Sequence, residues 1–154
     1  MGILTLDEWE RLYRAENRRI WRALVASYGD PEVAADAVAE AFVQAIGSGS
    51  TIRDPAAWIW KAAFKIAAGE LQRRGTLDEL KHQGVYEMAD PELPRLIEAL
   101  RRITPTQRTV VVLHDYADRP TVEISEILDM KLPTIHVHLS QGRKRLRDIL
   151  GETR

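Results

Sequence analysis

Apolar residues recur at three- and four-residue spacing along most of the chain, which is the pattern of helices that bury one face. Between about Thr5 and Tyr28 they form one continuous stripe, made of Trp9, Leu12, Tyr13, Ile20, Trp21, Leu24 and Val25. Gly29, Asp30 and Pro31 then supply a stop, an N-cap and a first-turn proline, so a second helix is predicted to begin there. Its expected inward positions are Val33, Ala34, Ala37, Val38, Ala41, Phe42, Ala45 and Ile46.

A third helix is predicted after the polar loop 47–51, because Asp54 and Pro55 provide a cap and a first-turn proline. Its expected inner face includes Ala62, Ile66 and Leu71. The periodicity then breaks around Gly75. Residues 76–91 contain Gly84 and Pro91 but no regular apolar spacing, so this segment is predicted to be a linker.

Helical periodicity resumes beyond the linker. One helix is expected from about Glu92 to Ile103, and a second from the start signal Thr104-Pro105 to about Tyr116. The run 110–113 is rich in valine, but it is too short and too closely flanked by helix signals to be a strand. We therefore predict an all-α fold of two small helical domains, residues 1–75 and 92–154, joined by the 76–91 linker.

Residues 121–147 have the pattern of a helix-turn-helix. Ile124, Ile127 and Leu128 lie on one face of a short helix. Asp129 can adopt the left-handed conformation that ends such a helix, and Pro133 suits the first position of the next one. A unit of this shape places its second helix in the major groove of DNA. An ordinary helical hairpin has the same pattern and stays open at this point.

The second helix of this unit has two distinct sides. It is expected to bury Ile135, Leu139 and Leu146. The residues expected to face outward are Thr134, His136, Val137, His138 and Gln141. Four of the five residues from 143 to 147 are basic, which favours contact with phosphates along the end of this helix.

Composition indicates the cellular compartment of the protein and the kind of partner that it needs. The 154 residues are 45% hydrophobic, contain no cysteine and carry a formal charge of -1. The missing cysteine excludes disulfides and thiolate metal sites. No apolar window is long enough for membrane insertion, and the acidic start is unlike a secretion signal, so a cytoplasmic protein is expected. A protein that grips DNA alone usually has a positive excess, so another molecule would have to hold this one on DNA.

Catalytic and metal chemistry have no support in the sequence. There is no glycine-rich phosphate loop and no nucleophile with a base beside it, and His82 and His114 are isolated. His136 and His138 are two residues apart, whereas ligand pairs on a helix are three or four apart. We therefore expect no catalytic residue, no metal site and no cofactor.

Two motif sets resemble a known family. Residues 103–108 (Ile-Thr-Pro-Thr-Gln-Arg), 123–128 (Glu-Ile-Ser-Glu-Ile-Leu) and 134–135 (Thr-Ile) resemble the C-terminal domain of bacterial sigma factors. Residues 29–42 resemble the polymerase-binding segment of the extracytoplasmic-function class, and residues 54–58 through 71–74 its promoter-melting segment. The resemblance implies an alternative sigma factor, not an enzyme, with core RNA polymerase, promoter DNA and an anti-sigma factor as partners.

The resemblance assigns polymerase binding to the second predicted helix. Glu32, Asp36 and Glu40 are four residues apart and form one acidic stripe. Asp36 and Glu40 follow the family pattern, and Gln44 stands where a basic residue is common. These three residues are the candidate polymerase contacts, while a solvated helix face is the alternative for the stripe.

The third helix would open the promoter. Aromatic faces stack on unpaired bases while cations follow the backbone of single-stranded DNA. The candidates are Arg53, Trp60, Lys61, Phe64, Lys65, Arg73 and Arg74. Trp58 is expected in the core, and Trp60 and Phe64 on a more exposed side. The loop 47–53, where the family captures a flipped base, looks short and glycine-rich here. Phe64, Lys65 and Gly69 also depart from the family's arginine, asparagine and aspartate.

The last helix would read the upstream promoter element. Residues 133–138 (Pro-Thr-Ile-His-Val-His) replace the family's Gly-Thr-Val and alternating basic residues. Gln141 could pair with adenine and Val137 could contact a thymine methyl group. The full candidate set is Thr134, His136, Val137, His138, Gln141, Arg143, Lys144 and Arg145, with Arg147 as a further phosphate contact. Two other functions stay open: a sigma-like mimic that occupies an anti-sigma factor, and a stand-alone helix-turn-helix regulator.

Overall fold

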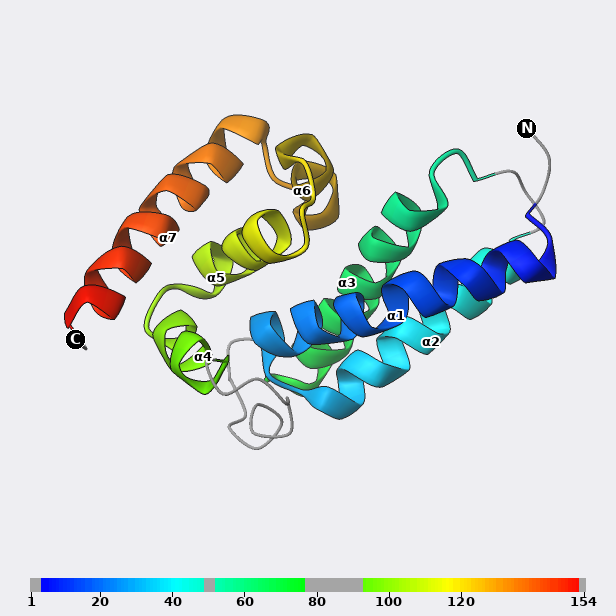
Figure 1. Ribbon diagram of the computed structural model, residues 1–154, viewed down its shortest axis with the longest axis horizontal. Coiled ribbons are helices and arrows are strands. Elements are labelled where there is room, and N and C mark those ends of the chain that lie inside the picture. The colour runs from blue at the N-terminus through cyan, green and yellow to red at the C-terminus, as the bar shows by residue number, and fades with distance from the viewer. Residues whose placement is uncertain (1–3, 49–51, 77–92, 153–154) are drawn as a thin grey trace.

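A computed structural model describes residues 4–48, 52–76 and 93–152, and these residues form helices without a strand (Figure 1). The helices are α1 (Leu6–Tyr28), α2 (Pro31–Gly47), α3 (Pro55–Arg74), α4 (Leu93–Arg101), α5 (Pro105–Val111), the π-helical stretch η1 (Val112–Tyr116), α6 (Thr121–Leu128) and α7 (Leu132–Glu152). The predicted all-α fold of two helical domains is confirmed. The predicted linker lies outside the described residues except for Thr76, and the exact domain limits stay a prediction.

The starts of the first three helices follow from their capping residues. The side chains of Thr5, Asp30 and Asp54 accept hydrogen bonds from backbone N–H groups three residues later, at 3.2, 3.0 and 3.1 Å. Proline follows Asp30 and Asp54 in the first turn, as the sequence predicts. Each cap contributes about 1 kcal/mol to helix stability, so local sequence alone places these boundaries.

The first domain is a bundle of α1, α2 and α3. The expected inward positions of α2 are buried except Ile46, which is 48% exposed. On α1 the main exception is Tyr13, whose ring lies at the rim with an edge-on contact to Phe42 at 5.0 Å. These exceptions lie on the outer side of the bundle, and they leave apolar surface along α1 and α2.

The orientation predicted for α3 is wrong in part. Its buried face is formed by Ile59, Trp60, Ala63, Phe64, Ala67 and Leu71. Ala62 and Ile66, expected inside, are only partly buried, and so is Trp58. The buried residues form one stripe at three- and four-residue spacing. Alanines and other apolar residues also lie beside this stripe, and α6 packs on α3 in addition to α1 and α2, so the sequence pattern alone did not fix which face is buried.

The second domain depends on a close approach of α7 to α5. A Cβ atom built on Gly142 would lie 2.9 Å from Val111 Cγ2 and 3.3 Å from Gln107 Cβ. Glycine therefore allows the two helices to touch. The capping box of Thr104 and Gln107, in which each side chain bonds the other's backbone N–H, fixes the start of α5 beneath this contact.

The two domains pack against each other. Arg108 Nη1 donates to the Ser27 carbonyl at 3.3 Å, and Arg19 Nη2 lies 3.3 Å from Asp118 Oδ2. The Arg119 guanidinium lies over the Trp60 ring, 5.2 Å from its centroid. These contacts join α1 and α3 to the segment from α5 to α6, so the helix-turn-helix covers part of the first domain (Figure 1).

Replacing Gly142 by leucine should lower the free energy of unfolding by about 2 kcal/mol, because the new side chain must displace Val111 in a packed contact. Urea unfolding followed by circular dichroism measures this change. Gly69→Ala on α3 is the matched control. Its added Cβ meets nothing within 4 Å, so the better helix propensity of alanine should stabilise the protein by about 0.5–1 kcal/mol. Equal effects of the two substitutions would contradict the packing argument.

The interdomain contact also predicts an alkaline transition. Burial raises the pKa of Tyr28 from 10.0 to about 12, although a side-chain hydrogen bond with Thr109 acts in the opposite direction. Between these two pH values the unfolded chain loses a proton that the folded protein keeps, so the free energy of unfolding should fall as the pH rises. Chemical unfolding at a series of pH values measures this slope.

Tyr28→Phe should make the slope shallower, since it removes the titrating group. Tyr13→Phe is the control, because the Tyr13 side chain is 44% exposed. Identical slopes in the wild type and in Tyr28→Phe would show that Tyr28 does not titrate as a buried group.

Candidate nucleic-acid interface

The helix-turn-helix is built from α6, a short turn and α7. Asp129 ends α6 in the left-handed region, with φ at 52°, as the sequence predicts. The Met130 N–H donates to the Ser125 carbonyl at 3.0 Å, and the Ser125 hydroxyl donates to the Met130 carbonyl. α7 begins at Leu132, one residue before the predicted start at Pro133. Together these bonds fix the angle between the two helices.

α7 presents most of its candidate DNA contacts to solvent. Ile135, Leu139 and Leu146 are buried, as expected. Five candidates are exposed, namely His136, Val137, Gln141, Lys144 and Arg145. Three are partly buried, namely Thr134, His138 and Arg143. α7 packs against α4, α5 and α6 and lies on the side of the molecule away from α2 (Figure 1), so its outer face is accessible.

Two of these candidates are restricted by their surroundings. His138 Nδ1 is enclosed and has no hydrogen-bond partner among the described residues, so this atom cannot reach a base in the present rotamer. Gln141 Oε1 accepts a hydrogen bond from Gln107 Nε2 at 3.5 Å. Gln141 is thus oriented by α5, but its amide nitrogen does not take part in that bond.

A shallow hollow of about 350 Å³ runs along α7. Its lining residues are His136, Leu139, Ser140, Arg143 and Arg147. Cationic and hydroxyl groups in such an arrangement suit the phosphate groups of a DNA strand. Arg147 therefore joins the candidate contacts on the same side of the helix as His136.

Arg143 is bound within its own domain. Its Nε donates to Asp115 Oδ2 at 2.9 Å, its Nη2 donates to Asp115 Oδ1, and Nη2 also lies 3.0 Å from His114 Nδ1. Hydrogen bonds from Arg143 hold the pKa of Asp115 below its usual value, with a smaller contribution from His114, while partial burial opposes the shift. From the sequence His114 is expected to be isolated, and Asp115 is not a candidate, because they lie 29 and 28 residues before Arg143.

The expected exposure of Trp60 and Phe64 is wrong. Trp60 is 0% and Phe64 1% exposed. Their rings stack with centroids 6.1 Å apart, and Trp60 Nε1 donates to Glu16 Oε2 at 3.1 Å. Arg119 covers the Trp60 ring from the second domain. In this arrangement neither aromatic face is available for stacking on a base.

The cations predicted for the melting helix have different surroundings. Lys65 is exposed, and so is Arg53 before the helix, while Lys61 is partly buried. Arg73 and Arg74 at the end of α3 both bind the Glu70 carboxylate, Arg74 at 2.8 Å. Hydrogen bonds from Arg73 and then Arg74 lower the pKa of Glu70. Much of the positive charge at this end of α3 is therefore balanced locally.

The candidate polymerase contacts lie on the outer face of α2. Asp36, Glu40 and Gln44 are all exposed, and Gln44 Nε2 donates to Glu40 Oε1 at 3.1 Å. Val43 is also exposed there, so this face is partly apolar. Sequence reasoning did not identify that apolar component.

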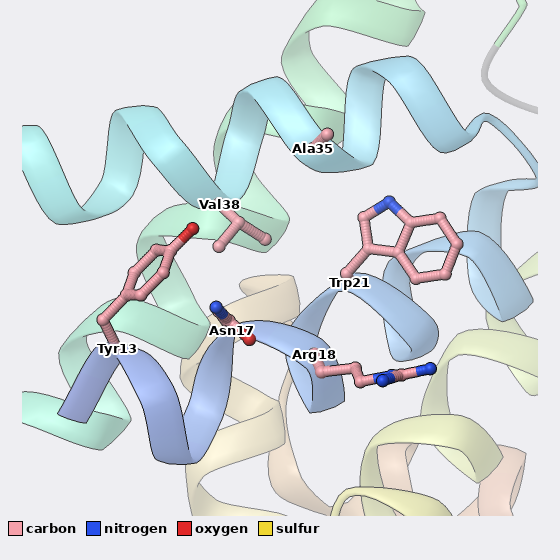
Figure 2. Close-up of a pocket in the computed structure, with 6 residues that line it drawn as sticks. All are labelled: Tyr13, Asn17, Arg18, Trp21, Ala35 and Val38. Carbon is pink, nitrogen blue, oxygen red and sulfur yellow. The ribbon is translucent and has the colours of Figure 1, made fainter. Parts of the chain in front are cut away.

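A groove of about 240 Å³ lies between α1 and α2, on another side of α2. It is lined by Tyr13, Asn17, Arg18, Trp21, Ala35 and Val38 (Figure 2). Tyr13 and Trp21 extend from α1 toward α2 at opposite ends of the groove (Figure 2), and Trp21 Nε1 donates to the Pro31 carbonyl at 3.1 Å. The groove is mostly apolar, but Asn17 and Arg18 also line it.

Two kinds of feature are absent from the described residues. No group of three or more His, Cys, Asp or Glu side chains there could hold a metal ion. In the same residues, no helix is both long and apolar enough to cross a membrane.

Comparison with known proteins agrees with this geometry. Residues 93–146 match the family Sigma-70, region 4. The whole fold is similar to that of the sigma factor RpoE, solved in complex with the anti-sigma factor NepR from Bartonella quintana, with a TM-score of 0.76 and 15% identity over 97% of this chain and 100% of that one. CnrH, solved in complex with the cytosolic domain of CnrY, gives a TM-score of 0.70 and 19% identity over 96% and 90% of the two chains. No curated protein sequence matches the chain.

Residues 93–146 thus resemble sigma-70 region 4 in sequence, and the fold of the described helices is similar to that of solved sigma factors. The family match is limited to residues 93–146, and for the rest of the chain the similarity is one of fold. The individual DNA and polymerase contacts stay predictions.

The cover over Trp60 can be tested by Arg119→Gln. This change removes the cation from the indole face and a 3.4 Å ion pair with Glu123, so amide hydrogen exchange in α3 should become faster. A contact of this kind is worth about 0.5–2 kcal/mol, which corresponds to a few-fold or larger change in exchange rate. Hydrogen–deuterium exchange followed by mass spectrometry measures it.

Arg145→Gln on the exposed side of α7 is the control for this change, since it removes an equal charge far from α3. Exchange rates in α3 that are the same in both variants would contradict a contribution of Arg119 to the interdomain contact.

Proposed function

We propose that this protein is an alternative sigma factor that binds core RNA polymerase and directs it to a promoter. One observation carries the proposal: a region 4 helix-turn-helix is present within a sigma-factor fold that spans both domains. A sigma factor acts by binding and positioning, so we assign no catalytic step to this chain. The role also requires the cytoplasm, where the polymerase is.

The face of α2 supplies the polymerase contact in this proposal. Asp36 and Glu40 are exposed carboxylates on α2, and the groove between α1 and α2 lies on another side of the same helix. The carboxylates would speed the association with a basic partner helix and set its register. The groove would add apolar contacts that raise the affinity. Gln44, bonded to Glu40, would hold that carboxylate in position.

DNA contact is divided between weak elements. The chain has a formal charge of -1, and several of its arginines are paired with carboxylates. Each DNA-binding region can nevertheless be effective when the polymerase holds both at high effective concentration. The sixteen residues of the predicted linker could span roughly 50 Å when extended, about 15 base pairs at ~3.4 Å each.

The packed arrangement bears on the order of events. Trp60 is covered by Arg119 of the second domain, so its use in strand opening requires the domains to separate. Phe64 is buried against Trp60 and Tyr28. Polymerase binding would have to offset the interdomain contacts of Arg19, Arg108 and Arg119. An anti-sigma factor, of the kind bound to the similar RpoE, would instead favour the packed arrangement.

A sigma-like mimic is the second candidate. It would occupy an anti-sigma factor and contact no promoter. The buried aromatic residues of α3 and the histidines on α7 favour it, because both replace groups that the family uses on DNA. A stand-alone helix-turn-helix regulator is a third possibility, and it would need self-association to pair two half-sites.

Run-off transcription separates these functions. Core polymerase with this protein should initiate at discrete sites on fragmented genomic DNA of the same bacterium, and core polymerase alone should not. Co-purification with core polymerase in the absence of specific transcripts would leave the mimic. Failure of both would overturn the proposal.

Charge reversal on α2 tests the polymerase contact in the same assay. The double variant Asp36→Lys, Glu40→Lys should lose at least about tenfold in affinity for core polymerase, since two attractive contacts become repulsive. Asp7→Lys is the control, because Asp7 is exposed at the start of α1 and away from the groove. Unchanged affinity of the double variant would contradict the assignment of this face.

A further inference from the structure

The ion pair between Arg143 and Asp115 crosses from α7 to η1. Both carboxylate oxygens are used, Oδ2 by Nε at 2.9 Å and Oδ1 by Nη2. This two-point geometry fixes the plane of the guanidinium more firmly than a single hydrogen bond would. Arg143 Nη1 takes no part in either bond, so one end of the fork still points away from the carboxylate.

The position of the pair follows from the π-helical stretch. The Ala117 N–H donates to the Val112 carbonyl five residues earlier, at 3.0 Å. A wider turn of this kind inserts an extra residue into a helix and changes the direction of the side chains after it. Here it sets His114 and Asp115 beside the middle of α7.

Arg143 also belongs to the surface that would face DNA. It lines the hollow on α7 together with His136, Ser140 and Arg147. Its neighbours Lys144 and Arg145 are exposed. The structure thus has a carboxylate within the row of cations on the recognition helix.

We propose that Asp115 is a specificity-determining residue: it cancels the charge of Arg143 and so limits the hold of α7 on arbitrary DNA. This inference rests on the proposed function only in that α7 lies against DNA. Phosphate neutralisation supplies essentially all non-specific affinity. When a guanidinium that is already paired with a carboxylate contacts a DNA phosphate, few counterions are released from the DNA. Because the carboxylate also fixes the plane of the guanidinium, Nη1 can reach DNA in only one orientation of α7.

The protonation and exposure of the pair are consistent with this role. Because Arg143 lowers the pKa of Asp115, the carboxylate is ionised at neutral pH and the pair is close to neutral overall. The two side chains are 40% and 39% exposed, and pairs this exposed contribute little to folding. The pair therefore has a larger effect on the charge of the surface than on the stability of the fold.

The test is Asp115→Asn in the full chain, a substitution that keeps the shape of the side chain and removes its charge. Binding to a fluorescein-labelled random-sequence duplex is measured by fluorescence anisotropy from about 50 to 200 mM salt. Affinity at the lowest salt should rise about three- to tenfold, and the slope of log K against log salt should steepen by about one.

Asp148→Asn is the matched control, since Asp148 is an exposed carboxylate on the same helix. It changes the net charge equally but leaves the Arg143 pair intact, so its slope should stay near that of the wild type. The double variant Asp115→Asn, Arg143→Gln should also return to the wild-type slope. Thermal unfolding by circular dichroism checks that all variants fold.

The results that would overturn the role of Asp115 differ from those that would overturn the proposed sigma function. A slope in Asp115→Asn equal to that of the wild type or of Asp148→Asn would overturn the role of Asp115. Failure of the wild type to direct transcription, with the slope change present, would overturn the sigma proposal but leave the role of Asp115 intact. When transcription is specific, Asp115→Asn should increase initiation at weak sites relative to the main ones.

Discussion

One buried guanidinium constrains the arrangement of both domains. Arg108 is only 4% exposed, and it donates to the carbonyls of Leu100, Ile103 and Ser27. A charge removed from water is tolerated only where its donors are satisfied. The turn between α4 and α5 and the end of α1 must therefore come together around this one side chain. Two other interdomain contacts agree with this arrangement around Arg108: the contact of Tyr28 with Thr109, and the packing of α6 on α3.

Features set by neighbouring residues could be predicted from the sequence. The caps at Thr5, Asp30 and Asp54 and the left-handed Asp129 each depend on a few adjacent positions, and the structure has them all. The inner face of α7 was also predicted, because only one side of that helix is covered. The burial of Trp60 could not be predicted, since its cover, Arg119, is 59 positions away in the sequence and belongs to the other domain.

The effective positive charge of a surface also depends on residues that are distant in the sequence. The basic clusters at 73–74 and 143–147 look like continuous DNA-binding patches in the sequence. In the structure Glu70 balances one of the two charges of the first cluster, and Asp115 balances one of the charges of the second. Glu70 is close enough in the sequence to be noticed, whereas Asp115 becomes a neighbour of Arg143 only through the packing of η1 on α7. A count of arginines therefore overstates the electrostatic attraction that either surface offers to nucleic acid.

The contact at Gly142 has a consequence for how this protein can diversify. Gly142 of α7 lies so close to α5 that an added side chain must displace Val111, while positions 136, 137 and 141 are exposed. Substitutions at these exposed positions can therefore change the outer surface of α7 while the packing of its inner side stays the same. A substitution at position 142 disturbs the packing of α7 on α5, whereas a substitution at 136, 137 or 141 mainly alters the surface.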